Sequence, residues 1–187
     1  KAKIILKILN KTYPSTPIPL KHQNIFTLLV SVLLSAQCTD LNVNNVTKNI
    51  YPKYNQPKHF VKLGRKKIEQ LIKKIGIFRI KAKSIYFLSK QIIEKHNGKV
   101  PKTFEELEKL PGVGHKTASV VMSQGFGHPA FAVDTHIHRL AQRWGLTNGK
   151  NVVKTEEDLK RIFPKKNWAK LHLQIIYYGR EYCKARE

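Results

Sequence analysis

The sequence predicts an all-α protein, and three observations support this fold class. Apolar residues recur at helical spacing among the lysines of residues 1–13, and they fill a longer segment at 25–36. Residues that favour helix N-termini precede such segments, as Asn24 does before 25–36 and Asp134 does before 135–144. No stretch alternates apolar and polar residues for long enough to predict a strand.

The expected helices follow one another in order with short breaks. The N-terminal helix is followed by Pro14, Pro17 and Pro19, a stiff connector and a candidate domain boundary. A glycine-rich break at 125–129 is a second candidate boundary. One helix is expected to open at 155–158, with its acidic residues in the first turn as the helix dipole prefers. The other predicted helices span residues 25–36, 41–51, 57–63, 66–75, 80–96, 103–109, 116–122, 135–144 and 167–182.

The segment Leu-Pro-Gly-Val-Gly at 110–114 predicts a tight turn between two helices. Pro111 blocks continuation of the first helix, while Gly112 and Gly114 allow positive φ and a close approach by another backbone. Such a turn presents backbone N–H groups at the start of the second helix, where phosphate groups bind. The alternative is an ordinary hairpin of two helices with no ligand.

Lys116 and Asp134 are the candidate catalytic residues. Lys116 lies in the first turn of the helix after the hairpin, where the dipole disfavours a cation and so favours the neutral, nucleophilic amine. Asp134 is expected to cap the next helix and to stay ionised there. The alternatives are a lysine that only binds phosphate and an aspartate that only caps.

The charge of the chain indicates a polyanionic partner. Lys and Arg number 35 against 12 Asp and Glu, which gives a formal net charge of +23. Nucleic acid is a better match than an anionic membrane surface, although a lysine-rich proteome could account for part of the excess. The longest apolar run, 25–36, is too short to span a bilayer, and no signal peptide is recognisable. We therefore expect a cytoplasmic, nucleoid-associated protein that acts as a monomer and does not bind membranes.

The motifs LPGVGHKTASVV and AVDTHIHR, at this spacing, resemble those of helix-hairpin-helix glycosylases of the endonuclease III type. The resemblance extends from about residue 26 to residue 183. It implies that Lys116 attacks C1′ of a nucleotide sugar and that Asp134 assists. It also implies two helical domains with the active-site cleft between them. One is a helical barrel at 18–128 that contains the helix-hairpin-helix at about 103–122, and the other combines 1–17 with 129–187.

The same resemblance assigns residues that contact DNA. Gln37, in Leu-Ser-Ala-Gln at 34–37, would fill the space left by an extruded nucleotide, and Ile77 would penetrate the base stack. The alternatives are a solvent-exposed amide at Gln37 and a packed helix junction at Ile77. A faint echo of 116–120 at 81–85 could mark a second, degenerate hairpin. The further predicted DNA contacts are Phe78, Arg79, Gly112, Val113, Gly114, His115, Thr117 and His136.

A metal centre is not expected in this chain. His136 and His138 are two residues apart, so on a helix they would not share a face. The resemblance implies that Cys183, in Gly-Arg-Glu-Tyr-Cys at 179–183, begins a run of four cysteines that holds a [4Fe-4S] cluster. This chain provides one of the four, so the cluster could form only in a longer native chain.

The predicted function is base excision repair. The enzyme would remove damaged bases, specifically oxidised pyrimidines, from duplex DNA, and would cleave abasic sites by β-elimination through a lysine Schiff base. Its partner would be duplex DNA with a damaged base or an abasic site. The alternatives are a non-catalytic hairpin module that only docks on DNA and a monofunctional mismatch glycosylase, although glycosylases of that kind generally lack the lysine.

Overall fold

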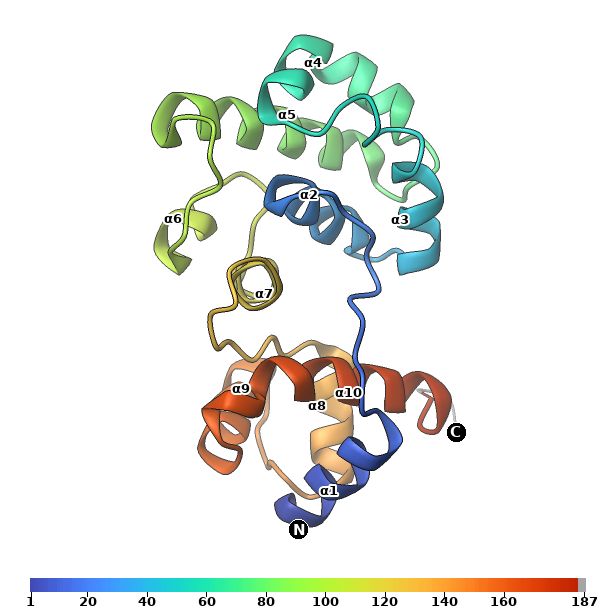
Figure 1. Ribbon diagram of the computed structural model, residues 1–187, viewed down its shortest axis with the longest axis vertical. Helices are drawn as coiled ribbons and strands as arrows, with labels where there is room; N and C mark the ends of the chain where they lie inside the picture. The colour runs from blue at the N-terminus through green and yellow to red at the C-terminus, as the bar shows by residue number, and fades with distance from the viewer. Residues whose placement is uncertain (185–187) are drawn as a thin grey trace. The chain divides into compact units, whose positions relative to one another are not determined.

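The computed structural model describes residues 1–184, and every regular element in that range is a helix (Figure 1). The prediction of an all-α protein is confirmed. The chain divides into two compact units, which we call the hairpin unit (Pro19–Phe126) and the terminal unit (Lys1–Ile18 with Gly127–Glu187). No helix within the described residues combines the length and the apolar character that crossing a bilayer requires.

The hairpin unit contains the first of the two candidate catalytic residues, Lys116, and is built around its most apolar helix. Its elements are α2 (Ile25–Ser35), α3 (Asp40–Thr47), α4 (Pro57–Leu71), α5 (Phe78–His96), α6 (Phe104–Glu108), α7 (His115–Val120) and the π-helix η1 (Val121–Gly125). All α2 residues from Phe26 to Leu34 are buried, and α2 contacts α3, α5, α7 and η1. Complete burial of one aliphatic side chain contributes about 1.5–3 kcal/mol, so α2 supplies much of the apolar stabilisation of this unit.

The helix boundaries in this unit follow from local chemistry. Asn24 and Thr27 form the reciprocal cap of α2: the Asn24 Oδ1 accepts from the Thr27 N–H at 2.8 Å, and the Thr27 hydroxyl oxygen accepts from the Asn24 N–H at 3.0 Å. Thr39 caps α3, its hydroxyl oxygen accepting from the Asn42 N–H at 3.2 Å. The two short helices expected at 57–63 and 66–75 form α4, which is interrupted at Gly64 by a φ of 73°. Figure 1 shows α4 and α5 lying side by side.

The predicted hairpin is α6, a tight turn and α7. Thr103 caps α6, and the Val113 N–H donates to the Leu110 carbonyl at 3.1 Å within the turn. Gly112 has a φ of 78°, and a Cβ added there would lie 2.7 Å from the Ser84 Cβ and 3.1 Å from a Leu33 methyl carbon. The turn is therefore seated directly on α5 and α2, and only a residue without a side chain fits.

The sequence predicts that Gly112 and Gly114 both serve the turn through positive φ and close packing, but Gly114 does neither. Its φ is −94°, and a Cβ added there would meet no atom within 4 Å. Packing among the residues that the structure describes therefore does not require glycine at this position, where the backbone caps α7. The helix after the turn is also longer than expected, because α7 continues into η1 as far as Gly125.

The terminal unit brings the start of the chain against its end. It contains α1 (Ala2–Thr12), α8 (Thr135–Arg143), α9 (Val152–Ile162), the short 3-10 helix η2 (Lys165–Asn167) and α10 (Trp168–Glu181), with α1 beside α10 (Figure 1). The buried Gln174 joins them, since its amide nitrogen donates to the Leu9 carbonyl at 3.2 Å and to the Tyr13 carbonyl at 3.0 Å. The core residues of this unit are Leu9, Phe131, Val133, Ile137, Leu140, Ala141, Leu146, Leu159, Phe163, Leu171 and Ile175.

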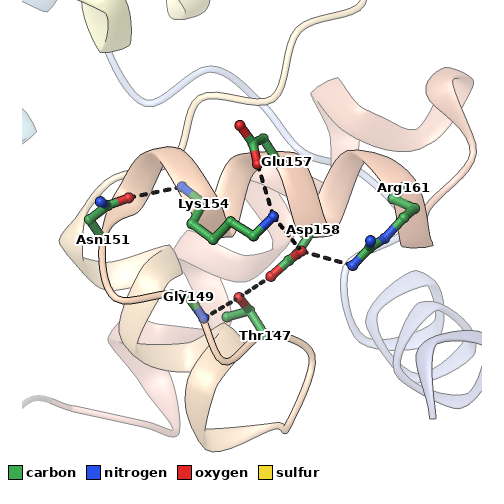
Figure 2. Close-up of polar contacts among 7 residues, drawn as sticks. All are labelled: Thr147, Gly149, Asn151, Lys154, Glu157, Asp158 and Arg161. Carbon is green, nitrogen blue, oxygen red and sulfur yellow. Dashed lines mark hydrogen bonds and ion pairs between the residues drawn. The ribbon is translucent and has the colours of Figure 1, made fainter.

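The acidic residues of α9 do not occupy its first turn, so that prediction was wrong. The helix begins at Val152 because Asn151 caps it, accepting from the Lys154 N–H at 2.9 Å. Asp158 instead lies mid-helix and fastens the preceding loop (Figure 2). Its carboxylate accepts from the Thr147 hydroxyl at 2.7 Å and from the Arg161 guanidinium at 2.9 Å, and Lys154 Nζ lies 3.8 Å away. The Thr147 hydrogen bond and these two cations hold the pKa of Asp158 below its ordinary value.

We expect Gly112→Ala to lower the free energy of unfolding by about 1–3 kcal/mol, because it forces both overpacking and an unfavourable φ. Urea denaturation measures this change. Gly114→Ala, in the same turn at a negative φ with open space around it, is the matched control and should unfold like wild type. Equal stabilities of the two variants would contradict the seating of Gly112 on Ser84.

The loop fastened by Asp158 should make stability depend on pH in a defined direction. A carboxylate whose pKa is lowered by folding stabilises the protein above its unfolded pKa, and this stabilisation is lost as the pH falls through the folded pKa. Asp158→Asn should therefore lower the melting temperature at neutral pH, and its difference from wild type should shrink below an unfolded pKa near 3.8. Glu157→Gln, an exposed neighbour that also contacts Lys154, is the control and should show no such dependence.

Candidate active site

Lys116 is the second residue of α7, directly after the hairpin turn, and its side chain is exposed. The preceding residue locks the start of this helix to α6. The imidazole of His115 bonds to the Glu108 carboxylate at 2.7 Å and stacks on the Phe104 ring at a centroid distance of 5.6 Å. Lys116 therefore projects from a backbone that is held by the turn on one side and by α6 on the other.

Asp134 caps α8 as the sequence predicts. Its Oδ1 accepts from the Ile137 N–H at 2.8 Å, a type of contact that stabilises a helix by about 1 kcal/mol. The residues before it are also fixed, because Phe131–Val133 are buried and the Ala132 carbonyl is bound by the ring nitrogen of His172 at 2.7 Å. The carboxylate is half-buried. Its position is therefore set before any substrate arrives.

Gln37 and Ile77 are the two residues predicted to enter the base stack, and we call them the wedge residues. They share an unusual backbone conformation. Gln37 has a φ of 55° and Ile77 a φ of 50°, both in the left-handed region that non-glycine residues rarely adopt. The side chain of Gln37 is exposed, and that of Ile77 is 51% exposed. A Cβ added at Gly76 would lie 4.0 Å from the Gln37 carbonyl oxygen, so the two loops are neighbours. Residues 40 positions apart in sequence are thus brought together in the hairpin unit.

Two side chains outside the predicted set connect these loops. The amide nitrogen of Asn42 donates to the Cys38 sulfur and to the Lys74 carbonyl, each at 3.2 Å. The ammonium of Lys81 donates to the Leu34 carbonyl at 2.8 Å and to the Ala36 carbonyl at 2.6 Å. The sequence does contain a signal for Lys81, since it shares the apolar face of α5 with Ile85, Leu88 and Ile92. A lysine in such a stripe has to find partners for its charge.

The other predicted DNA contacts lie in different surroundings. Phe78 is half-buried at the start of α5, with the exposed Arg79 guanidinium 5.6 Å from its ring centroid. Val113 is buried, and its N–H already donates to Leu110, so we expect it to support the turn rather than to contact DNA. Among the remaining predicted contacts, Gly112, Gly114, His115 and His136 are exposed, and Thr117 is half-buried.

The donor atoms of the described residues do not fit an iron–sulfur cluster. No three His, Cys, Asp or Glu side chains of residues 1–184 are grouped so that they could hold a metal ion. Cys183 belongs to the terminal unit, where its sulfur accepts from the Arg143 guanidinium at 2.9 Å, and Cys38 belongs to the hairpin unit. His138 bonds through its ring to the Thr155 hydroxyl at 2.7 Å. A cluster that needs four thiolates therefore cannot be assigned here.

Comparison with known proteins places this geometry in a family. A family model described as "HhH-GPD superfamily base excision DNA repair protein" matches residues 30–165, a range that includes the hairpin, Lys116 and Asp134. The chain belongs to the HhH-GPD superfamily. Endonuclease III of Bacillus subtilis (strain 168) is 47% identical over 175 residues, which cover 93% of this chain and 80% of that protein. Endonuclease III of Escherichia coli (strain K12) is 42% identical over 185 residues, covering 97% of this chain and 88% of that protein.

Solved structures of endonuclease III resemble this HhH-GPD protein along its whole length. A non-covalent endonuclease III–DNA complex has a TM-score of 0.95 at 44% identity, covering 99% of this chain and 87% of that one. A trapped covalent endonuclease III–DNA intermediate has a TM-score of 0.95 at 43% identity, covering 100% and 90%. A thermostable thymine-DNA glycosylase, at 21% identity and a TM-score of 0.87, shares the fold. The resemblance to endonuclease III seen in the sequence motifs is confirmed.

We expect this 187-residue HhH-GPD chain to bind no stoichiometric iron–sulfur cluster when it is treated anaerobically with iron and sulfide, because its two cysteines cannot supply the four thiolates that a cluster needs. Iron analysis and the visible absorbance of the cluster measure this. Cys183→Ser should match wild type in both. A cluster that forms on wild type and is lost in Cys183→Ser would contradict the expectation that this chain binds none.

Proposed function

We infer that this chain is a bifunctional base-excision-repair enzyme, a DNA glycosylase with AP lyase activity, whose partner is duplex DNA with a damaged base or an abasic site. The observation that carries this inference is Lys116. An exposed lysine stands directly after the hairpin, in a chain that resembles a covalently trapped endonuclease III–DNA intermediate over its full length. Family membership supports the repair role, and the lysine supports the lyase.

The chemistry assigned to Lys116 is nucleophilic attack on the sugar. The neutral amine forms a bond to C1′ while the glycosidic bond breaks, and the base departs with that electron pair and takes up a proton. The positive charge that develops on the sugar needs a fixed anion nearby. We propose that the Asp134 carboxylate supplies it and accepts the proton that Lys116 releases.

The second step follows from the covalent bond. The C1′–O4′ bond then breaks, O4′ takes up a proton and the ring opens, and the nitrogen of Lys116 and C1′ form a protonated Schiff base. This iminium withdraws electrons and acidifies the C2′ proton. Loss of that proton expels the 3′ phosphate by β-elimination, and water then releases the enzyme. No redox step is needed, and all the steps use side chains of this chain.

The arrangement of Asp134 suits this role. It is held by the cap of α8 and by the buried segment before it, so its charge need not reorganise as the sugar becomes positive. Lys116 is held comparably by the clamp that His115 makes to α6. We propose that Lys116 is the nucleophile of this reaction and that Asp134 supplies the carboxylate. The hairpin unit and the terminal unit would be the two domains that the sequence predicts.

DNA binding would use the hairpin and the basic surface. Gly114 leaves the start of α7 without a side chain although no atom of residues 1–184 crowds that position, as is expected where a phosphate approaches the backbone. Exposed Arg79 and His136 are proposed phosphate contacts, and Gln37 and Ile77 are proposed to occupy the emptied stack. Phe78, Gly112, His115 and Thr117 remain proposed contacts of the same surface.

Three further assignments are proposals. The damaged bases would be oxidised pyrimidines, and the protein would act as a monomer at the nucleoid in the cytoplasm. Cys183 would ligate a [4Fe-4S] cluster only in a chain that provides three further thiolates.

Borohydride reduction on a duplex with one abasic site tests the lysine directly. Wild type should form a covalent protein–DNA adduct, and Lys116→Ala should form none. Lys109→Ala removes an exposed lysine from the same hairpin and should trap like wild type.

Asp134→Asn keeps a capping side chain but removes the charge, so it should fold normally and lose about 10²–10⁴-fold in turnover on a duplex with an oxidised pyrimidine.

The result for each variant separates the alternatives. If wild type binds the duplex tightly and releases the base but forms no adduct, the protein is a monofunctional glycosylase. If wild type binds tightly but neither releases the base nor forms an adduct, the protein is a module that only docks on DNA. Equal trapping by Lys116→Ala and Lys109→Ala would assign the Schiff base to another lysine.

A further inference from the structure

Lys81 is a cation buried in a chain whose lysines are mostly on the surface. Its side chain is 3% exposed. Burying an ammonium group is costly unless it is well bonded. Here it donates to the Leu34 and Ala36 carbonyl oxygens at 2.8 and 2.6 Å. Both lie at the C-terminal end of α2, where the helix dipole favours a positive charge. Lys81 thus binds the loop that begins where α2 ends.

The two carbonyls that Lys81 binds both lie just before Gln37 in the chain. Ala36 immediately precedes Gln37, whose φ of 55° is sterically costly for a residue with a Cβ. A strained backbone persists only when its surroundings hold it. The ammonium of Lys81 does this directly, because it fixes the peptide unit that enters Gln37.

The backbone of Lys81 is tied to the other wedge residue. Its N–H donates to the Ile77 carbonyl at 3.2 Å, and the Ile80 N–H donates to the same carbonyl at 3.1 Å. Ile77, with a φ of 50°, starts α5 without any side-chain cap. One residue therefore contacts the loop of Gln37 through its side chain and the loop of Ile77 through its main chain.

Asn42 forms a second bridge between the same loops. Its amide bonds to Cys38, the residue after Gln37, and to the Lys74 carbonyl, three residues before Ile77. The Lys81 and Asn42 bridges hold Gln37 from both sides. Together they tie the two loops to each other within the hairpin unit.

We propose that Lys81 is a positioning residue, assisted by Asn42, that holds Gln37 and Ile77 together as a preformed wedge for extruding a nucleotide from duplex DNA. This inference rests on the proposed function and adds to it a buried lysine that touches neither DNA nor the reacting sugar. A site held in its working geometry does not have to be ordered during extrusion, and a displacement of about 1 Å can cost on the order of 10²-fold in rate.

Two duplexes separate positioning from chemistry. One carries an oxidised pyrimidine paired with adenine, with 2-aminopurine beside it as a fluorescent reporter of unstacking. The other carries a preformed abasic site, where no base has to be extruded. Wild type, Lys81→Met and Lys83→Met are compared, because Lys83 is an exposed lysine in the same turn of α5. Asn42→Ala and Asn45→Ala form the second pair, since Asn45 is exposed on α3.

Lys81→Met is expected to slow base excision and the 2-aminopurine signal by roughly 10- to 100-fold. It should leave borohydride trapping at the abasic site close to wild type. Asn42→Ala should show a smaller loss that likewise affects base excision and not trapping. Lys83→Met and Asn45→Ala should show no such difference between excision and trapping. A variant that lost a phosphate contact would weaken binding to both duplexes equally.

Each other outcome overturns one specific claim. If Lys81→Met matches wild type, or loses both activities equally while keeping its melting temperature, the positioning role is wrong. If Lys81→Met fails to fold, Asn42→Ala alone tests the proposal. Base extrusion by Asn42→Ala at the wild-type rate would then contradict the claim that these contacts hold the wedge residues in place. Failure of wild type itself to form an adduct at the abasic site would instead refute the proposed function.

Discussion

Burial of α2 is the constraint on which the rest of the hairpin unit depends. Every residue of this helix from Phe26 to Leu34 is buried, so the helix is stable only when other helices surround it. α3, α5, α7 and η1 provide that surrounding, and in doing so they take up the positions that matter for DNA. Leu33 of α2 receives the hairpin at Gly112, and the carbonyls at the end of α2 receive Lys81. One buried helix therefore positions both the hairpin and the proposed wedge.

Two lysines in similar sequence surroundings are used in opposite ways. Residues 81–85 echo residues 116–120, and each segment lies in the first turns of a helix that follows a glycine. Lys116 is exposed on α7, whereas Lys81 is buried against the end of α2. The difference lies in what each helix packs against. A helix face turned to the core forces its lysine to find internal acceptors, while an exposed face leaves the amine accessible to a substrate.

In the terminal unit, the Asp134 carboxylate is positioned in a different way. Asp134 follows the buried segment Phe131–Val133 and caps α8, so hydrophobic burial fixes the chain before it and a helix cap fixes the chain after it. Gly179 lets α10 approach α8 closely, since a Cβ there would lie 2.7 Å from a Leu140 methyl carbon. The Asp158 network then secures the loop that leads into α9. Polar contacts in this unit mainly fix loops whose helices are already positioned by apolar packing.

The sequence by itself determined the features that depend on neighbours along the chain. The helix caps at Asn24 and Asp134, the hairpin turn and the all-α fold class were predictable, because a cap or a turn is decided within a few residues. The acidic cluster of α9 shows the limit of this approach. A favourable dipole suggested that the helix begins at the acids, whereas Asn151 caps it earlier and Asp158 serves a loop contact.

Only the tertiary structure decided which distant residues meet. The approach of the Gln37 loop to Gly76, the inward course of the Lys81 side chain and the seating of Gly112 on Ser84 join segments that are 28 to 47 positions apart. Such contacts depend on how the helices pack around α2, and no local propensity encodes them. For that reason the sequence could identify Lys116 and Asp134 by their motifs, while the residues that hold the wedge emerged only from the fold.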